Sequence, residues 1–228
     1  MEKKKGKNPP PVPMEDIKYV LLDLDGTLLD KYFDDYFWEH LVPEKYAEKF
    51  GVTFGRAKEE LLAKYKSHEG TLNWTDLDFW SEELGLDIPA LKEQTRHLIE
   101  VHPHVEDFLG HIRGLGKKVY LVTNAHYRAI EIKFRKTGIG KYFDHVVASC
   151  SMGAPKESPE FWKKTEALLH FEKDKSLFID DTEDILETAK AYGIKYVLLK
   201  EKPASKEIRK KKVTGRFPSI RDFRDLMR

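Results

Sequence analysis

Residues 17–28 read IKYVLLDLDGTL, and this stretch decides the fold. Residues 17–23 form a nearly continuous apolar run that ends in a polar turn, as expected for a strand buried on both faces of a parallel sheet. Two carboxylates, Asp23 and Asp25, stand at the end of this run. Because ligands in open α/β sheets bind beyond the carboxyl ends of the strands, we expect both carboxylates to face a site there.

Four more apolar runs of this kind follow along the chain. Helical patterns separate them, and glycines or a Ser-Pro pair stand where such helices would end or begin. Strands that alternate with helices predict an α/β fold whose core is a Rossmann-like, mostly parallel sheet. The four runs are residues 117–123, 145–149, 176–180 and 195–199.

The interval 31–100 breaks this alternation because it contains no convincing strand. Thr75, with acidic residues just after it, looks like the N-cap of one of several helices. We therefore predict an all-helical cap at residues 31–100, inserted into a core domain made of residues 15–30 and 101–228. The helical patterns within the cap cover residues 33–41, 43–50, 56–67, 76–84 and 89–99.

The composition indicates an ordinary globular protein of 228 residues, in which 40 Lys and Arg nearly balance 39 Asp and Glu. No strong overall field therefore favours a nucleic-acid or membrane partner. We expect the Lys- and Pro-rich residues 1–14 to form a disordered arm, and the basic run 206–212 to be solvated surface. The single cysteine, Cys150, cannot form an internal disulfide, which favours a reducing cytoplasm. The sequence has no apolar stretch near the roughly 18 residues of a membrane helix, and nothing typical of a secretion signal.

Polar side chains follow the other predicted strands as well. Thr123 and Asn124 end the second strand and can hold phosphate oxygens without adding charge. Lys156 comes after the third strand and can neutralise a phosphate. Asp180 and Asp181 end the fourth strand, where a bound cation would relieve their mutual repulsion. Each signal is weak alone, but with the two carboxylates after the first strand they predict a site for Mg²⁺ and phosphate.

The order Asp-x-Asp-Gly-Thr, Thr-Asn, Lys and Asp-Asp resembles the four motifs of the haloacid dehalogenase superfamily, over residues from about 14 to about 225. The resemblance implies that Asp23 attacks phosphorus and forms an aspartyl-phosphate. It implies that Asp25 protonates the leaving alcohol and later deprotonates the attacking water. Asp25 also separates the chain from the dehalogenases themselves, which need no acid for a halide.

The same resemblance implies which residues bind the phosphate and the metal. Thr123 and the backbone of Asn124 would hold the transferring phosphoryl group, and Lys156 would offset the charge on the nucleophile and the phosphate. The cofactor would be Mg²⁺. Its implied ligands are Asp23, Asp25 through its backbone carbonyl, Asp180, and Asp181 either directly or through water.

Several strings in the cap and beside the motifs carry a closer resemblance, to the bacterial GMP/IMP 5′-nucleotidase family. It implies hydrolysis of a purine nucleoside monophosphate, a small-molecule phosphate ester, to nucleoside and phosphate. No motif identifies the residues that would read the base. The strings are residues 28–43, 70–88, 123–133, 155–162 and 177–186.

Two other functions stay open: a broad small-metabolite or sugar-phosphate phosphatase, and a catalytically idle binding protein that keeps the fold. Turnover of many unrelated esters would support the first, and no turnover with Mg²⁺ the second. The aromatic residues of the cap fit either a packed helical core or a stacking wall for a base, and residues 68–74 are expected to form a loop. His102 and His104 form a pair that can bind zinc, but a hinge or surface role is favoured because no spaced third ligand accompanies them.

Overall fold

The computed structural model describes residues 12–206 and 215–227, which contain a six-stranded sheet of order β3-β2-β1-β4-β5-β6. Every neighbouring pair of strands is parallel. Five strands confirm the five predicted runs, whereas the two-residue β6 was not predicted. The strands are β1 Tyr19–Leu22, β2 Lys118–Thr123, β3 His145–Ala148, β4 Ser176–Asp180, β5 Tyr196–Lys200 and β6 Ser219–Ile220.

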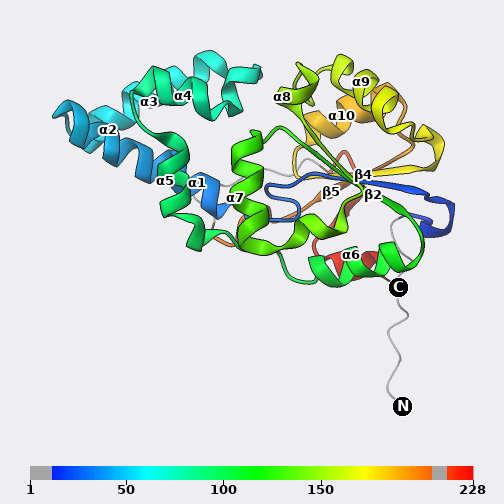
Figure 1. The fold of residues 1–228 in the computed structure, drawn as a ribbon. Coiled ribbons are helices and arrows are strands. Elements are labelled where there is room, and N and C mark those ends of the chain that lie inside the picture. Colours follow the sequence, from blue (N-terminus) through cyan, green and yellow to red (C-terminus); the bar gives the residue numbers. More distant parts are fainter. Residues whose placement is uncertain (1–11, 207–214, 228) are drawn as a thin grey trace.

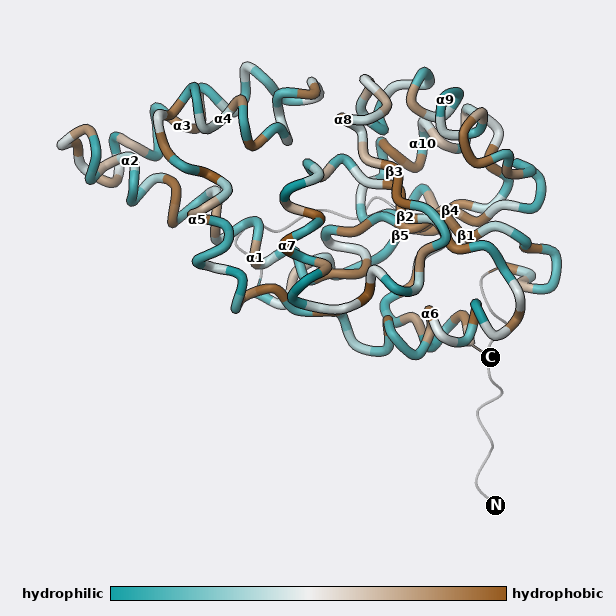
Figure 2. The backbone as a smooth tube through the Cα atoms, in the orientation of Figure 1, coloured by the Kyte–Doolittle hydropathy of each residue, from teal (hydrophilic) through white to brown (hydrophobic). Residues whose placement is uncertain are grey.

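Different helices cover the two faces of the sheet (Figure 1). Val20 and Leu22 share a hydrophobic cluster with α6 (Val105–Gly114) and α7 (Tyr127–Thr137). Leu21, which points the other way, shares a second cluster with α9 (Pro159–Leu169) and α10 (Glu183–Tyr192). Both faces of β1 are therefore buried, which explains why its sequence is a continuous apolar run (Figure 2).

Local signals fix several helix ends. Ser158 caps α9 by accepting a hydrogen bond from the Glu160 N–H, and Pro159 follows at the first helical position. Gly138 and Gly193 end α7 and α10 in the left-handed conformation that glycine adopts without a Cβ clash. These three ends confirm the predicted caps.

Residues 32–98 form helices and turns without a strand, and they lie to one side of the sheet in Figure 1. Two details correct the sequence analysis. The side chain of Asp76, not Thr75, caps α4, and the helix predicted at 89–99 stops at Gln94 and continues as a 3₁₀ turn. The helices are α1 Tyr32–Tyr36, a π-helical turn Phe37–Leu41, α2 Val42–Phe50, α3 Phe54–His68, α4 Leu77–Leu84 and α5 Ile88–Gln94. A division into a cap at 31–100 and a core at 15–30 and 101–228 stays our proposal.

The aromatic side chains of this helical region mostly form its core. Phe37 and Trp80 are fully buried in a separate hydrophobic cluster, and Phe79 packs against it. Trp74 is 41% exposed and belongs to the 3₁₀ turn Leu72–Thr75, within the segment that was predicted to be a loop. Trp74 is therefore the aromatic residue of this segment that solvent or a ligand can reach.

The N-terminal prediction needs one correction. Residues 1–11 lie outside the described residues, but Val12 and Met14 are buried in the core cluster, so the packed chain starts before residue 15. Of the basic run 206–212 only Lys206 is described. Within the described ranges no helix combines the length and the apolar character needed to cross a membrane.

Candidate active site

Three carboxylates meet where the strands end. One oxygen each from Asp23, Asp180 and Asp181 lies within 4.8 Å of the others, and all three residues are buried. The Lys156 ammonium lies between two of them, 2.5 Å from Asp23 Oδ1 and 2.7 Å from Asp180 Oδ2. Residues from three of the four motifs therefore occupy one small volume.

The register of the sheet explains this meeting. Leu22 is level with Leu121 and with Ile179, so β1, β2 and β4 end at the same edge. The backbone N–H of Asp23 donates to the Ile179 carbonyl, which extends the pairing by one residue. The side chains of Asp23 and Asp180 consequently emerge side by side.

Gly26 lets the loop after β1 pass close to Asp181. Its φ is +86°, a conformation that side chains disfavour, and a Cβ added there would lie 2.8 Å from Asp181 Cγ. The glycine of the motif is thus required by both backbone conformation and space.

The Thr-Asn motif organises the neighbouring loops. The Thr123 hydroxyl accepts from the Ala125 N–H, while Asn124 Oδ1 accepts from the Lys156 N–H and Asn124 Nδ2 donates to Glu157. The side chain of Asn124 therefore holds the segment that carries Lys156. Because its side chain is occupied in this way, Asn124 would contact the phosphate through its backbone, as the resemblance implies.

The cluster has a surplus of negative charge. The pKa of Asp23 is raised to about 8, because burial and the charges of Asp180 and Asp181 together outweigh the opposing effect of Lys156. Lys31 lies 3.7 Å from Asp181 and is the second ammonium at the cluster. Three carboxylates facing two ammoniums fit a divalent cation, and their oxygens are the hard donors that Mg²⁺ prefers.

Asp25 lies outside this cluster, in a second charged network. Its Oδ1 is 2.7 Å from the Lys133 ammonium, which is also 2.7 Å from Asp34 Oδ2. On the other side, Asp34 Oδ1 accepts from Lys92 at 2.6 Å. Burial raises the pKa of Asp25, and the opposing effect of Lys133 does not cancel this. A raised pKa suits a carboxyl group that must carry a proton near neutral pH.

The sequence did not point to Lys133 and Lys92, which lie in the network beside the candidate site. Both are only 2% exposed. One signal was available: in an amphipathic pattern Lys133 follows Ala129 by four positions and Ile130 by three, so it falls on the buried face of its helix. A lysine on such a face needs a carboxylate partner.

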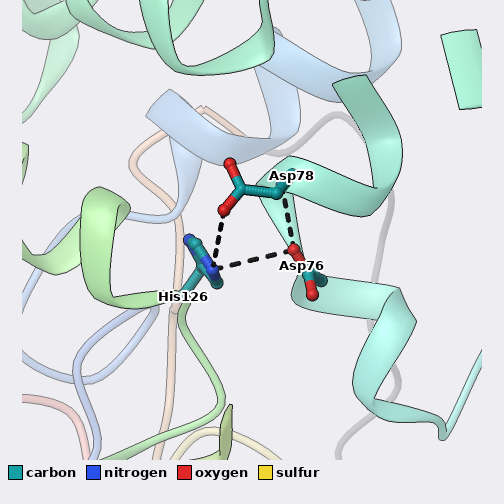
Figure 3. Close-up of side chains that lie close together, drawn as sticks. All are labelled: Asp76, Asp78 and His126. Atoms are coloured by element: carbon teal, nitrogen blue, oxygen red, sulfur yellow. Dashed lines mark hydrogen bonds and ion pairs between the residues drawn. The ribbon is translucent and has the colours of Figure 1, made fainter. Parts of the chain in front are cut away.

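His126 connects α4 with the start of α7, two residues after Asn124. Its Nε2 lies 3.6 Å from Asp76 Oδ1 and 4.0 Å from Asp78 Oδ2 (Figure 3). Burial lowers the pKa of His126 against the opposing effect of the two carboxylates. The helical region and the core thus touch beside the Thr-Asn motif.

The predicted His-x-His pair behaves differently. His102 Nε2 lies 3.1 Å from the Pro203 carbonyl, and His104 adopts a left-handed conformation before α6. Among the described residues neither belongs to a group of three side chains that could hold a metal. The hinge or surface role favoured from the sequence stays a prediction.

Comparison with known proteins decides the family. The model of the haloacid dehalogenase-like hydrolases matches residues 17–193. The chain is a haloacid dehalogenase-like hydrolase. The GMP/IMP nucleotidase YrfG of Escherichia coli is 38% identical to this hydrolase over 213 residues, which are 93% of this chain and 95% of the relative.

More distant proteins share the fold. A phosphoglycolate phosphatase of Pseudomonas syringae is 24% identical over 80% of this hydrolase and 69% of its own length. The crystal structure of a HAD phosphatase from Thermococcus onnurineus superposes with a TM-score of 0.77 at 24% identity, over 92% of this chain and 96% of that chain. These findings confirm the predicted superfamily, the fold class and the enzyme class, a phosphatase.

Proposed function

We propose that this phosphatase is Mg²⁺-dependent, acts through an aspartyl-phosphate on Asp23, and hydrolyses purine nucleoside monophosphates, GMP and IMP, to nucleoside and phosphate. The observation that carries the mechanism is the buried cluster of Asp23, Asp180 and Asp181 around the Lys156 ammonium. The substrate rests on the 38% identity to the E. coli GMP/IMP nucleotidase over nearly the whole of both chains.

The proposed reaction has two steps. In the first, a carboxylate oxygen of Asp23 attacks phosphorus in line, the ester P–O bond breaks, and Asp25 gives its proton to the departing 5′-oxygen. In the second, Asp25 takes a proton from water, the water oxygen bonds to phosphorus, and the bond from phosphorus to Asp23 breaks. Inorganic phosphate leaves and both carboxyl groups return to their starting states.

The other site residues would position the phosphoryl group. Lys156 contacts both Asp23 and Asp180, so its charge would offset that of the nucleophile and of the incoming phosphate. Thr123 and the backbone of Asn124 would hold the phosphate oxygens. Asp23, Asp180, Asp181 and the backbone carbonyl of Asp25 would hold Mg²⁺, which supplies charge neutralisation and orientation when bound.

One alternative substrate class has its own support. One relative is 24% identical and is named a phosphoglycolate phosphatase, not a nucleotidase. A broad small-metabolite phosphatase is therefore the second candidate. A cytoplasmic location stays a prediction that rests on the single cysteine, which is a free exposed thiol.

Phosphate release from a panel of esters tests the proposal. The panel holds GMP, IMP, AMP, CMP, phosphoglycolate and several sugar phosphates, each with Mg²⁺ and with EDTA. We expect Mg²⁺-dependent release that favours GMP and IMP. Mg²⁺-dependent release with another preference would overturn the substrate, and no release from any ester would overturn the enzymatic mechanism.

A further inference from the structure

The network around Asp34 contains two equally buried lysines that both contact Asp34 but differ in their other contacts. Lys133 lies between Asp25 and Asp34, at 2.7 Å from each. Lys92 contacts Asp34 at 2.6 Å, and its ammonium lies over the rings of Phe33 and Phe37, at 4.7 and 4.3 Å from their centroids. Only Lys133 therefore touches the proposed acid and base of the reaction.

The buried ion pairs of this network restrict the movement of its side chains. Removing one partner of a buried ion pair leaves an uncompensated charge, so each ion pair holds its own two partners in place. The Lys133 ammonium lies 2.7 Å from Asp25 Oδ1, and this contact limits the orientation of the carboxyl group. An oxygen that faces an ammonium holds a proton less readily, so Oδ2 would carry the proton.

The network also joins two parts of the chain. Asp25 and Lys133 come from the loop after β1 and from α7, whereas Asp34 and Lys92 come from α1 and α5 in the helical region. Asp34 contacts the same Lys133 ammonium as Asp25. The placement of the Asp25 carboxyl group thus depends on how the helical region sits on the core.

We propose that Lys133 is a positioning residue that fixes the Asp25 carboxyl group for proton transfer, and that Asp34 anchors Lys133 in that place. The inference rests on the proposed role of Asp25 and deepens it. Proton transfer by a positioned side chain contributes about 10²–10⁴-fold to rate, and it needs hydrogen-bond reach to the reacting oxygen. A carboxyl group that rotates freely would lose part of this factor.

The leaving group provides the test. A nucleoside 5′-oxygen is a poor leaving group and needs the proton, whereas p-nitrophenolate departs without one. The quantity to measure is kcat/KM, because it reports the steps up to release of the alcohol and excludes the later hydrolysis. The ratio of kcat/KM for GMP to that for p-nitrophenyl phosphate therefore isolates the acid function of Asp25.

We expect Lys133→Met to lower this ratio at least about tenfold, a fraction of the full contribution of an acid. The matched control is Lys92→Met, which removes an equally buried lysine and leaves the contact between Lys133 and Asp25. We expect it to change the ratio less than about twofold. If Lys133→Met does not fold, as judged by thermal unfolding, Lys133→Gln replaces it, with a change in the same direction.

An unchanged ratio in a folded Lys133 variant would overturn the inference. So would an equal change in Lys92→Met, because the network would then act only as a support for the helices. Wild-type enzyme that hydrolyses other alkyl phosphates but not GMP would instead overturn the proposed substrate, and the preferred alkyl ester would take the place of GMP in the ratio.

Discussion

Gly26 lies where the loop after β1 comes nearest to Asp181, so adding a single methyl group there probes the geometry of the candidate metal site. In Gly26→Ala the new Cβ would lie 2.8 Å from Asp181 Cγ and 2.9 Å from the Pro203 side chain, at a φ of +86°. Real side chains do not approach so closely, and Asp181 is buried and has little room to shift. Either the loop or Asp181 must therefore move.

The size of the effect follows from two parts. A left-handed backbone costs an L-residue about 1–2 kcal/mol. Overpacking a tight contact costs about 1–3 kcal/mol more. The total of about 2–5 kcal/mol corresponds to a fall of roughly 4–20 °C in melting temperature for a chain of this size. Because the displaced group is a proposed Mg²⁺ ligand or its support, the Mg²⁺ concentration for half-maximal activity should rise about 10–100-fold.

Gly51→Ala is the matched control. Gly51 also has a positive φ, +65°, but a Cβ added there meets nothing within 4 Å. It should lose only the backbone part, about 1–2 kcal/mol, and keep its response to Mg²⁺. Thermal unfolding and Mg²⁺ titration of phosphate release on both variants give the comparison. Equal melting temperatures together with equal Mg²⁺ requirements would refute the reasoning.

Three further predictions concern the acidic groups. Asp23→Asn should keep the fold and lose at least about 10³-fold in turnover, since an amide is a poor nucleophile; substantial remaining phosphate release would exclude the covalent mechanism. Asp25→Asn should slow both formation and hydrolysis of the aspartyl-phosphate by about 10²–10⁴-fold, and rapid-quench rates equal to wild type would place the proton elsewhere. Burial raises the pKa of Asp23 to about 8, so below that pH protons compete with the cation for this carboxylate. The Mg²⁺ concentration for half-maximal activity should rise up to about tenfold for each pH unit below 8, and a requirement that stays constant between pH 6 and 8 would contradict this.

The sheet was predictable because β1, β2, β4 and β5 are buried on both faces along most of their length. The continuous apolar run of residues 17–23 is by itself enough to predict a buried strand. Glycines such as Gly138 and Gly193 mark where the helices between the strands end. The short β6 and the single-turn α8 (Ser149–Met152) were missed. Two to four residues carry too little periodicity to stand out, and their conformation depends on the neighbours that pair with or cover them.

The cluster of Asp23, Asp180 and Lys156 was predictable for a different reason. Parallel strands bring their carboxyl ends to one edge, so residues far apart in sequence meet once the strands are recognised. No such rule places Asp34 beside Lys92 and Lys133, which are 58 and 99 residues away from it. Their meeting depends on how the helical region folds back onto α7, and sequence periodicity carries no information about that contact.

The carboxylate cluster around Lys156 and the network around Asp34 differ in charge balance, and this difference favours different roles for them. In the first, Asp23, Asp180 and Asp181 face Lys156 and the more distant Lys31, so negative charge is in excess and a divalent cation is favoured there.

The second network has no surplus of negative charge, because Asp25 and Asp34 face two lysines, Lys133 and Lys92. A cation brought to it would meet two ammoniums as well as two carboxylates, so it gains little by binding there. In the proposed mechanism the Asp25 side chain would therefore stay available for proton transfer and the metal would stay on the neighbouring carboxylates, although only Leu24 separates Asp25 from the proposed nucleophile. Two aspartates so close in sequence can hold distinct roles because different lysines, from different parts of the fold, balance their charges.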